Sequence, residues 1–399
     1  LGATPATEAT DLESLTGKGL RARVNGEDVY LGKQSLFTEI SGPAVPPALA
    51  ADVNRLETLG RTVFVVRHGT RYLGAVGLMD TPRAAAKAER ANTLYDVMTA
   101  AQDWFVTQFQ GLEGAEARAY CEKRGLKPET NKAFGIGYAP DSRGKLKEAL
   151  KHFGEEKLVE AGLLISVDDK EPYDRFRGRL MIPIRDPRGR VIAFGGRILG
   201  AGEPKYLNSP DTPLFDKGRT LYNLDKASAA SRASGRVIVV EGYMDVIALA
   251  QAGFGEAVAP LGTALTEQQI IMLWRMVPKP LLCFDGDSAG QKAAFRAAQR
   301  ALGGLKPGHS LEFVTLPEGM DPDDLVKKSG ARAFGALLDQ AEPLVERIWK
   351  AELAAGPTSA PEDRAGLKQR LGTQLANIAD TEIRRHYADA FAERFDMLF

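Results

Sequence analysis

Acidic residues end two apolar stretches in the middle of the chain and have the chemistry to hold a divalent cation. The first stretch starts at Arg236 and ends at Glu241, and the second starts at Pro280 and ends at Asp285 and Asp287. Both read as buried strands that are followed by helices. The carboxyl ends of parallel strands face one crevice, so we expect these carboxylates to converge. Hard oxygen ligands favour Mg²⁺ or Mn²⁺ over zinc.

A third acidic segment follows a third predicted strand, residues 310–316, and contains Asp321 and Asp323. The alternation of strands and helices from 236 to 326 predicts a compact α/β unit with three acidic strand ends. The first two clusters have simpler alternatives, a capping carboxylate at Glu241 and an ordinary turn at 285–287. Their joint placement favours a metal site.

The predicted chemistry is phosphoryl transfer. Two metal ions about 4 Å apart would activate an attacking hydroxyl and neutralise charge on the phosphoryl group. Glu241, Asp285 and Asp287 are the predicted catalytic residues, and Glu241 is the candidate for general acid–base work. Asp245, one helical turn beyond Glu241, is expected to support the metal ligands or to pair with a basic neighbour. None of the four histidines lies near these strands, which disfavours histidine-based catalysis.

Arginines crowd two predicted strands between residues 174 and 199, which are joined by a tight Asp-Pro-Arg-Gly turn. An irregular segment with further lysines, residues 204–219, follows. For any single arginine, a solvated surface is an equally good interpretation. Together, the cations and the interleaved Phe and Tyr residues predict a groove that contacts phosphates and stacks bases.

Composition narrows the class of protein. The chain has 399 residues, with 52 basic and 52 acidic side chains, so nucleic-acid binding requires local basic patches. Its two cysteines, Cys121 and Cys283, form no CxxC pair, which predicts no structural zinc and a reducing cytoplasm. No apolar run reaches the roughly 18 residues that span a bilayer. The chain begins at Leu1 and ends within a predicted helix, so we expect a fragment or a spliced chain.

The first 86 residues have their own pattern of two predicted hairpins and a helix over 49–60, with Asn25-Gly26 as one turn. They resemble part of the nucleotide-binding region of P-type cation-transporting ATPases. The resemblance rests on Thr16-Gly-Lys-Gly, Gly60-Arg-Thr-Val and Gly77-Leu-Met-Asp-Thr-Pro-Arg. The family's Asp-Lys-Thr-Gly-Thr motif and its membrane helices are missing, and Ala22 stands where a third glycine is expected. Transport is therefore excluded, and nucleotide binding stays open.

The rest of the chain, from about residue 90, resembles the catalytic core of bacterial DnaG-type DNA primases. Glu241-Gly-Tyr-Met-Asp with Asp285-Gly-Asp is similar to the signature of the Toprim domain. The flanking motifs Phe-Gly-Gly-Arg, Pro-Lys-Tyr-Leu-Asn-Ser-Pro, Phe-Asp-Lys-Gly-Arg and Gly-Met-Asp-Pro-Asp-Asp occur in the family's order. The resemblance implies synthesis of RNA primers on single-stranded DNA from ribonucleoside triphosphates, with an RNA–DNA hybrid as product and a location at the cytoplasmic replisome.

The resemblance also implies roles for particular residues. It assigns one to three Mg²⁺ or Mn²⁺ ions to Glu241, Asp285, Asp287, Asp321 and Asp323. It assigns contacts with nucleic acid or nucleotide to Arg175, Arg197, Lys205, Asn208, Lys217 and Asp245. No part of this sequence resembles the family's zinc-binding domain or its helicase-binding domain. The replicative helicase is therefore expected as a partner of full-length family members.

The expected fold class is α/β, and α+β for the whole chain. We expect four domains, which are an ATPase-like fragment (1–86), a subdomain with the basic groove (87–234), a Toprim subdomain (235–330) and a helical bundle (331–399). Two other functions stay open. One is phosphodiester cleavage, as in Toprim nucleases and topoisomerases, although a topoisomerase needs a nucleophilic tyrosine in a further domain that the pattern lacks. The other is an inert single-stranded DNA-binding fragment.

Overall fold

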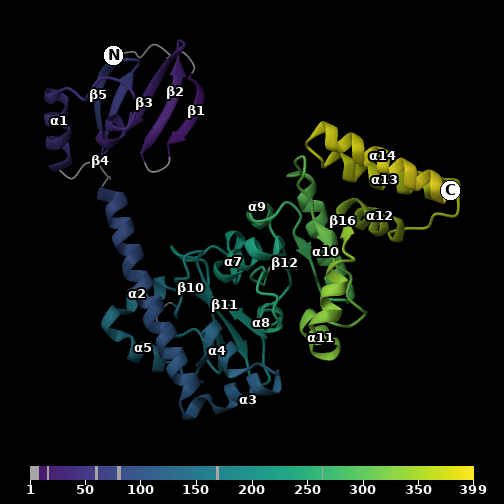
Figure 1. The fold of residues 1–399 in the computed structure, drawn as a ribbon. Helices are drawn as coiled ribbons and strands as arrows, with labels where there is room; N and C mark the ends of the chain where they lie inside the picture. Colours follow the sequence, from purple (N-terminus) through teal and green to yellow (C-terminus); the bar gives the residue numbers. More distant parts are fainter. Residues whose placement is uncertain (1–8, 16–17, 59–61, 79–81, 168–169, 263) are drawn as a thin grey trace. The chain divides into compact units, whose positions relative to one another are not determined.

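The computed structural model describes residues 9–15, 18–58, 62–78, 82–167, 170–262 and 264–399 (Figure 1). The chain forms two compact units, residues 1–90 and 91–399. The boundary between them falls close to the expected one at 86, and helix α2 (Pro82–Gln110) contains it. No helix among the described residues is long and apolar enough to cross a membrane.

The first unit is an antiparallel sheet in the order β1-β2-β3-β4-β5. Helix α1 (Pro47–Thr58) packs on β4 and β5, with Val53 against Val63 and Val65. The predicted Asn25-Gly26 turn is confirmed, because both residues have positive φ, as a tight hairpin requires. The elements are β1 (Thr10–Leu15), β2 (Gly19–Val24), β3 (Glu27–Gly32), a 3-10 helix η1 (Gln34–Thr38), β4 (Thr62–His68) and β5 (Arg71–Leu78).

The second unit opens with helices around an antiparallel sheet in the order β11-β10-β9-β6. The two predicted arginine-rich strands are β9 and β10, joined by a turn at residues 186–190, and Phe105 and Phe194 pack edge to face beside them. The strands are β6 (Gly137–Ala139), β7 (Leu164–Val167), β8 (Lys170–Asp174), β9 (Arg179–Arg185), β10 (Val191–Ile198) and β11 (Tyr206–Asn208), and the helices are η2 (Leu112–Gly114), α3 (Ala115–Lys123), α4 (Pro128–Phe134), α5 (Lys145–Ala149), η3 (Lys151–Phe153), α6 (Glu155–Glu160) and η4 (Lys217–Arg219).

A second sheet follows in the order β13-β12-β14-β15-β16, in which all neighbours except β15 and β16 run parallel. Alternate residues in and beside strand β12 pack into different hydrophobic cores. Ile238 and Val240 pack on one face of the sheet, and Val237 and Val239 pack on the other. The predicted α/β unit is therefore a sheet with helices on both faces. Its elements are α7 (Leu224–Ser234), β12 (Ile238–Val239), α8 (Tyr243–Gln251), β13 (Ala257–Val258), α9 (Glu267–Trp274), β14 (Leu281–Leu282), α10 (Ser288–Leu302), β15 (Glu312–Phe313) and α11 (Pro322–Leu338).

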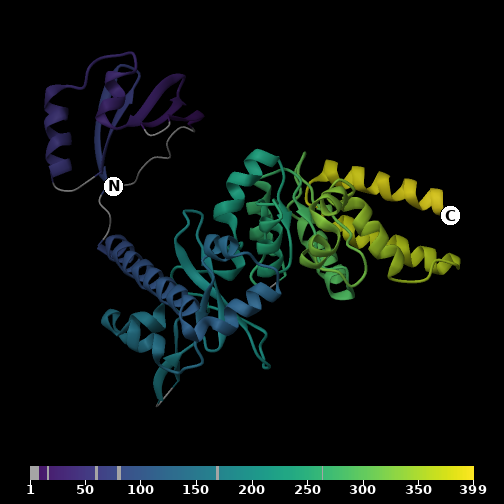
Figure 2. The same ribbon diagram turned by 60° about the horizontal axis from the view of Figure 1, so that its bottom comes forward.

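The C-terminal part is mainly helical, with α12 (Leu344–Ala354), α13 (Pro361–Ala376) and α14 (Thr381–Leu398). Helices α13 and α14 lie side by side (Figure 2). The sequence beyond residue 331 predicts helices throughout, broken by a linker at 356–361, and this prediction is wrong at one point. Residues Glu342–Pro343 form β16, which pairs with β15 and closes the edge of the sheet. Helix α11 ends at Leu338, and Pro343 is the N-cap of α12, so β16 occupies the short connection between these two helices.

Candidate active site

The structure brings the first two acidic segments into contact at the carboxyl ends of their strands. The backbone N–H of Asp285, which follows β14, donates to Glu241 Oε1, which follows β12, at 3.0 Å. The third segment reaches the same edge, because the Gly286 N–H donates to the Met320 carbonyl at 2.9 Å. A Cβ on Gly286 would lie 2.2 Å from the Pro317 carbonyl oxygen, so only glycine permits this approach.

These carboxylates repel one another electrostatically. The pKa of Asp285 is raised to about 7 by burial and by the charges of Glu241, Asp321 and Asp287. Burial and the Asp287 charge likewise raise the pKa of Glu241. The pKa of Asp245 lies well above its ordinary value because the carboxyl is buried and faces Asp321 and Asp285. The raised pKa values reflect the closeness of these carboxylates, which the strand ends predicted.

The charge and the free oxygens at this edge fit a divalent cation. Asp285 Oδ1 is buried and has no hydrogen-bond partner. Asp287 and Asp321 each cap a helix through one oxygen, accepting from the backbone N–H of Gly290 (2.8 Å) and Asp324 (2.6 Å). Within the described parts of the chain, no three carboxylate, imidazole or thiolate groups surround a common point. A cation shared by these residues therefore requires side-chain rotation.

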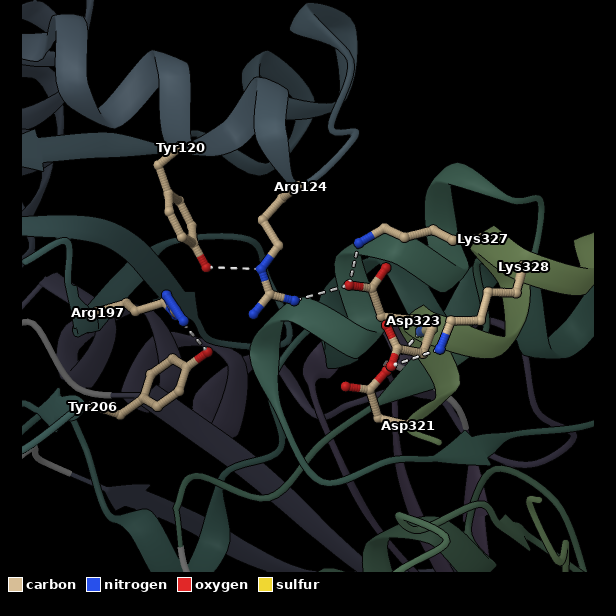
Figure 3. A network of polar contacts seen from close by, with 9 residues as sticks. Tyr120, Arg124, Arg197, Tyr206, Asp321, Asp323, Lys327 and Lys328 are labelled. Atoms are coloured by element: carbon tan, nitrogen blue, oxygen red, sulfur yellow. Dashed lines mark hydrogen bonds and ion pairs between the residues drawn. The ribbon is translucent and has the colours of Figure 1, made fainter. Parts of the chain in front are cut away.

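Asp323, also a predicted metal ligand, lies in a different environment. Its side chain is 2% exposed and forms ion pairs with Arg124, at 3.1 Å, and with Lys327 (Figure 3). Arg124 lies at the end of α3, so this pair connects the helical region to the first turn of α11 across 199 residues of sequence. No sequence pattern indicates this ion pair, because Arg124 belongs to a segment without acid–base motifs. The contacts of Asp323 suit a positioning role.

Arg197, one of the predicted phosphate contacts, lies against two tyrosine rings. Its guanidinium carbon is 4.5 Å from the Tyr120 ring centre and 5.6 Å from that of Tyr206 (Figure 3). Arg197 Nε donates to Tyr206 Oη at 3.2 Å, and Arg124 Nε donates to Tyr120 Oη at 2.9 Å. The network therefore connects Arg197 through Tyr120 and Arg124 to Asp323. The cation–π contact with Tyr120 and the hydrogen bond to Tyr206 together hold the Arg197 guanidinium in one orientation.

The other predicted binding residues are placed less uniformly. Asn208 accepts from Tyr243 Oη (2.6 Å) and donates to the Leu261 carbonyl (2.9 Å), so it joins β11 to helix α8 and to the loop that follows β13. Lys205 is exposed and Lys217 partly exposed. Arg175 is half-buried, burial lowers its pKa, and its backbone N–H donates to Leu163. In the described parts of the chain, no hydrogen bond or ion pair joins Arg175 to the acidic segments.

Replacing Asp323 by Asn should destabilise the second unit by about 2–3 kcal/mol, because a buried carboxylate that pairs with two cations is lost. The matched control is Asp324→Asn in the same helical turn, where the half-exposed Lys328 pair is worth at most about 0.5 kcal/mol. Urea unfolding followed by tryptophan fluorescence reports this unit alone, since Trp104, Trp274 and Trp349 all lie in it. Equal stabilities of the two variants would contradict the positioning role.

A mostly parallel sheet with Glu241, Asp285 and Asp287 at its carboxyl edge defines a Toprim domain, and the model of the Toprim domain family matches residues 235–315. The model of the DNA primase catalytic core, N-terminal domain, matches residues 104–228. The chain belongs to the family of DnaG-type DNA primase catalytic cores.

Individual relatives agree with this assignment. A DNA primase from Neisseria meningitidis is 48% identical over 263 residues, which cover 66% of this chain and 44% of that protein. The structure of a DnaG primase catalytic domain bound to single-stranded DNA is 41% identical, with a TM-score of 0.69, and the match covers 77% of this chain and 99% of that one. A primase domain from Pseudomonas aeruginosa is 43% identical, with a TM-score of 0.71 and coverage of 75% and 95%. The chain spans about half the length of the curated relatives it matches.

Proposed function

We propose that this chain synthesises short RNA primers on single-stranded DNA from ribonucleoside triphosphates. The observation that carries the proposal is the contact between Glu241 and Asp285 at the carboxyl edge of a parallel sheet, in a chain of the primase catalytic-core family. Polymerisation is favoured over cleavage because the chain belongs to the primase catalytic-core family and because its arginine-rich strand pair, β9 and β10, precedes the acidic sheet.

The residues would act at different stages of the reaction. Divalent metal, Mg²⁺ or Mn²⁺, would be held by Glu241, Asp285 and Asp287 with help from Asp321, and it would supply charge neutralisation at the phosphoryl group. Glu241, whose pKa is raised by burial, is suited to accept the proton of the attacking 3′-hydroxyl. Burial and the charges of Asp321 and Asp285 raise the pKa of Asp245, which would support the residues that hold the metal.

The substrate contacts are assigned from chemistry and position. Arg197, held by its two tyrosines, together with Lys205 and Lys217, would contact phosphates of the template or the nucleotide. Asn208 would hold strand β11 against helix α8 and the loop that follows β13. Arg175, half-buried and away from the acids, is the least supported of these assignments. The replicative helicase would be the partner of the longer family members, and the cytoplasmic replisome the place of action.

One incubation tests the proposal against both alternatives. The chain is mixed with single-stranded template, labelled ribonucleotides and Mg²⁺ or Mn²⁺. Labelled oligoribonucleotides that disappear without metal support a primase. Shortened template would instead support a nuclease, and retardation of the template without any product would support a DNA-binding fragment.

Removing residues 1–86 should leave this synthesis within about threefold, a change of under ~0.7 kcal/mol in the barrier. The reason is that residues 1–90 form a compact unit with its own core, and the acidic segments all belong to the other unit. The truncated chain is first checked for native tryptophan fluorescence. Loss of synthesis in a folded truncated chain would mean that the ATPase-like segment supplies a nucleotide-binding wall.

A further inference from the structure

A cavity of about 300 Å³ opens beside Glu241, and none of the roles proposed above involves a ligand in this cavity. Apolar groups of Pro260, Leu265, Phe284 and Ala293 line it together with polar groups, and the polar surface is the larger of the two. Among the described residues that line it, only Glu241 and Arg296 carry charge. This volume lies at the lower end of the range in which proteins enclose small organic ligands. A cavity of mixed polar and apolar lining, with one carboxylate and one guanidinium, suits a ligand that combines an uncharged body able to hydrogen-bond with an anionic tail.

The walls of this cavity are fixed by neighbouring elements. The loop that carries Leu261 and Leu265 is held at two points, since Asn208 Nδ2 donates to the Leu261 carbonyl (2.9 Å) and Arg300 Nη1 donates to the Leu265 carbonyl (2.7 Å). Phe284, which directly precedes Asp285, is buried. The described parts of the cavity wall are therefore held in place, and Glu241 is common to the cavity and the acidic site.

Arg296 is the cation of this cavity, on helix α10. Its side chain is exposed, and within the described parts of the chain no carboxylate lies within ion-pair distance of it. Its positive charge nevertheless reaches Glu241, where it opposes the effect of burial on the pKa of that carboxyl. Arg296 thus has free donors beside the acidic site. The guanidinium fork matches phosphate oxygens better than any other side chain does.

We propose that this cavity holds the nucleotide that supplies the attacking 3′-hydroxyl, with its sugar beside Glu241 and its 5′-phosphates on Arg296. The proposal rests on the proposed function and adds the site of the initiating nucleotide to it. The 3′-oxygen forms a bond to the α-phosphorus of the incoming nucleotide, and the bond from that phosphorus to pyrophosphate breaks. The hydroxyl proton passes to Glu241, and pyrophosphate leaves.

Arg296 should matter most for the first bond of a primer. The initiating nucleotide has no upstream chain, so only one template base and this cavity hold it. During extension, the RNA–DNA hybrid holds the primer end, and its last nucleotide carries a single phosphodiester charge. The Arg296 contact therefore contributes a larger share of binding at initiation than later.

The test varies the guanidinium and the 5′-phosphate together. Dinucleotide formation is measured with the initiating nucleotide supplied as a 5′-triphosphate, a 5′-monophosphate or the unphosphorylated nucleoside. Arg296→Ala should raise KM for the initiating triphosphate by about tenfold or more, with kcat within about threefold, because a charge-assisted contact is lost. KM for the nucleoside should not change. Arg296→Lys should be intermediate, and extension of an annealed RNA primer should stay within about threefold.

Lys292→Ala is the matched control, since Lys292 is exposed on the same helix one turn earlier and does not line the cavity. It should behave as wild type. Equal changes in KM for triphosphate and nucleoside would overturn the proposal. So would a rise in KM confined to the incoming nucleotide, or a loss of single-stranded DNA affinity in Arg296→Ala, because these would assign Arg296 to another ligand.

A binding measurement separates this proposal from the proposed function. Equilibrium dialysis with labelled adenosine 5′-monophosphate and adenosine needs no turnover. Wild type should bind the monophosphate more tightly than adenosine, and Arg296→Ala should remove that difference. If wild type makes no oligoribonucleotide, the proposed function fails, while the dialysis still reports on the cavity. Equal binding of both compounds to wild type would overturn the assignment of Arg296.

Discussion

Asp285→Asn and Asp287→Asn should each reduce RNA synthesis by ~10² or more, with binding of single-stranded DNA unchanged or slightly stronger. Each change removes one negative charge where burial and three neighbouring carboxylates already raise the pKa of Asp285 to about 7. Such a cluster stabilises a hard cation, and losing one of its charges weakens that stabilisation. Template binding should not suffer, because carboxylates repel phosphate. The measurement is primer synthesis across a Mg²⁺ titration, together with template binding by fluorescence anisotropy.

Both variants should remain folded, so a loss of RNA synthesis can be attributed to the acidic site. Asp287 is the N-cap of α10, and Asn caps a helix about as well as Asp does. The control is Glu318→Gln, an exposed carboxyl on the loop that follows β15 and precedes Asp321. It removes the same charge nearby without touching the cluster, so synthesis should be normal. Near-normal synthesis by both Asp variants would refute the metal assignment.

Much of this site could be predicted from the sequence because its parts follow a local rule. Short apolar runs that end in acid place Glu241 and Asp285 at the same edge of a parallel sheet. The Asn25-Gly26 turn and the turn at 186–190 were also predictable, since glycine and proline fix backbone geometry over a few residues. Predictions of this kind need only the chain neighbours of a residue.

Other features depend on contacts between distant segments, and no local pattern encodes them. The pairing of Arg124 with Asp323 joins residues 199 positions apart. Strand β16 forms because the edge of β15 is available, although its sequence precedes a helix directly. The cavity beside Glu241 arises from a loop, a strand end and a helix that meet only in the folded chain. The ATPase-like resemblance of residues 1–86 stays a prediction.

Replacing Arg197, Lys205 and Lys217 together by Ala should weaken single-stranded DNA binding strongly and flatten its salt dependence. Each phosphate contact on a single strand contributes about 0.7 to the slope of log affinity against log salt, so the triple variant should lose roughly 2. Lys205 and Lys217 are accessible to solvent and should each contribute a full contact. Arg197 is 8% exposed between its tyrosines, so it should contribute orientation as well as charge.

Single variants separate these two contributions. Lys205→Ala and Lys217→Ala should change the slope by about 0.7 each, whereas Arg197→Lys should keep the slope but lower affinity, because lysine retains the charge and loses the planar contact with Tyr120 and Tyr206. The controls are Lys306→Ala and Arg332→Ala, exposed cations outside residues 174–219. Anisotropy titrations from about 50 to 200 mM salt measure each slope. An unchanged slope in the triple variant would mean that these three residues do not contact phosphates and are ordinary solvated side chains. An unaltered affinity in Arg197→Lys would mean that the two tyrosines do not contribute to binding.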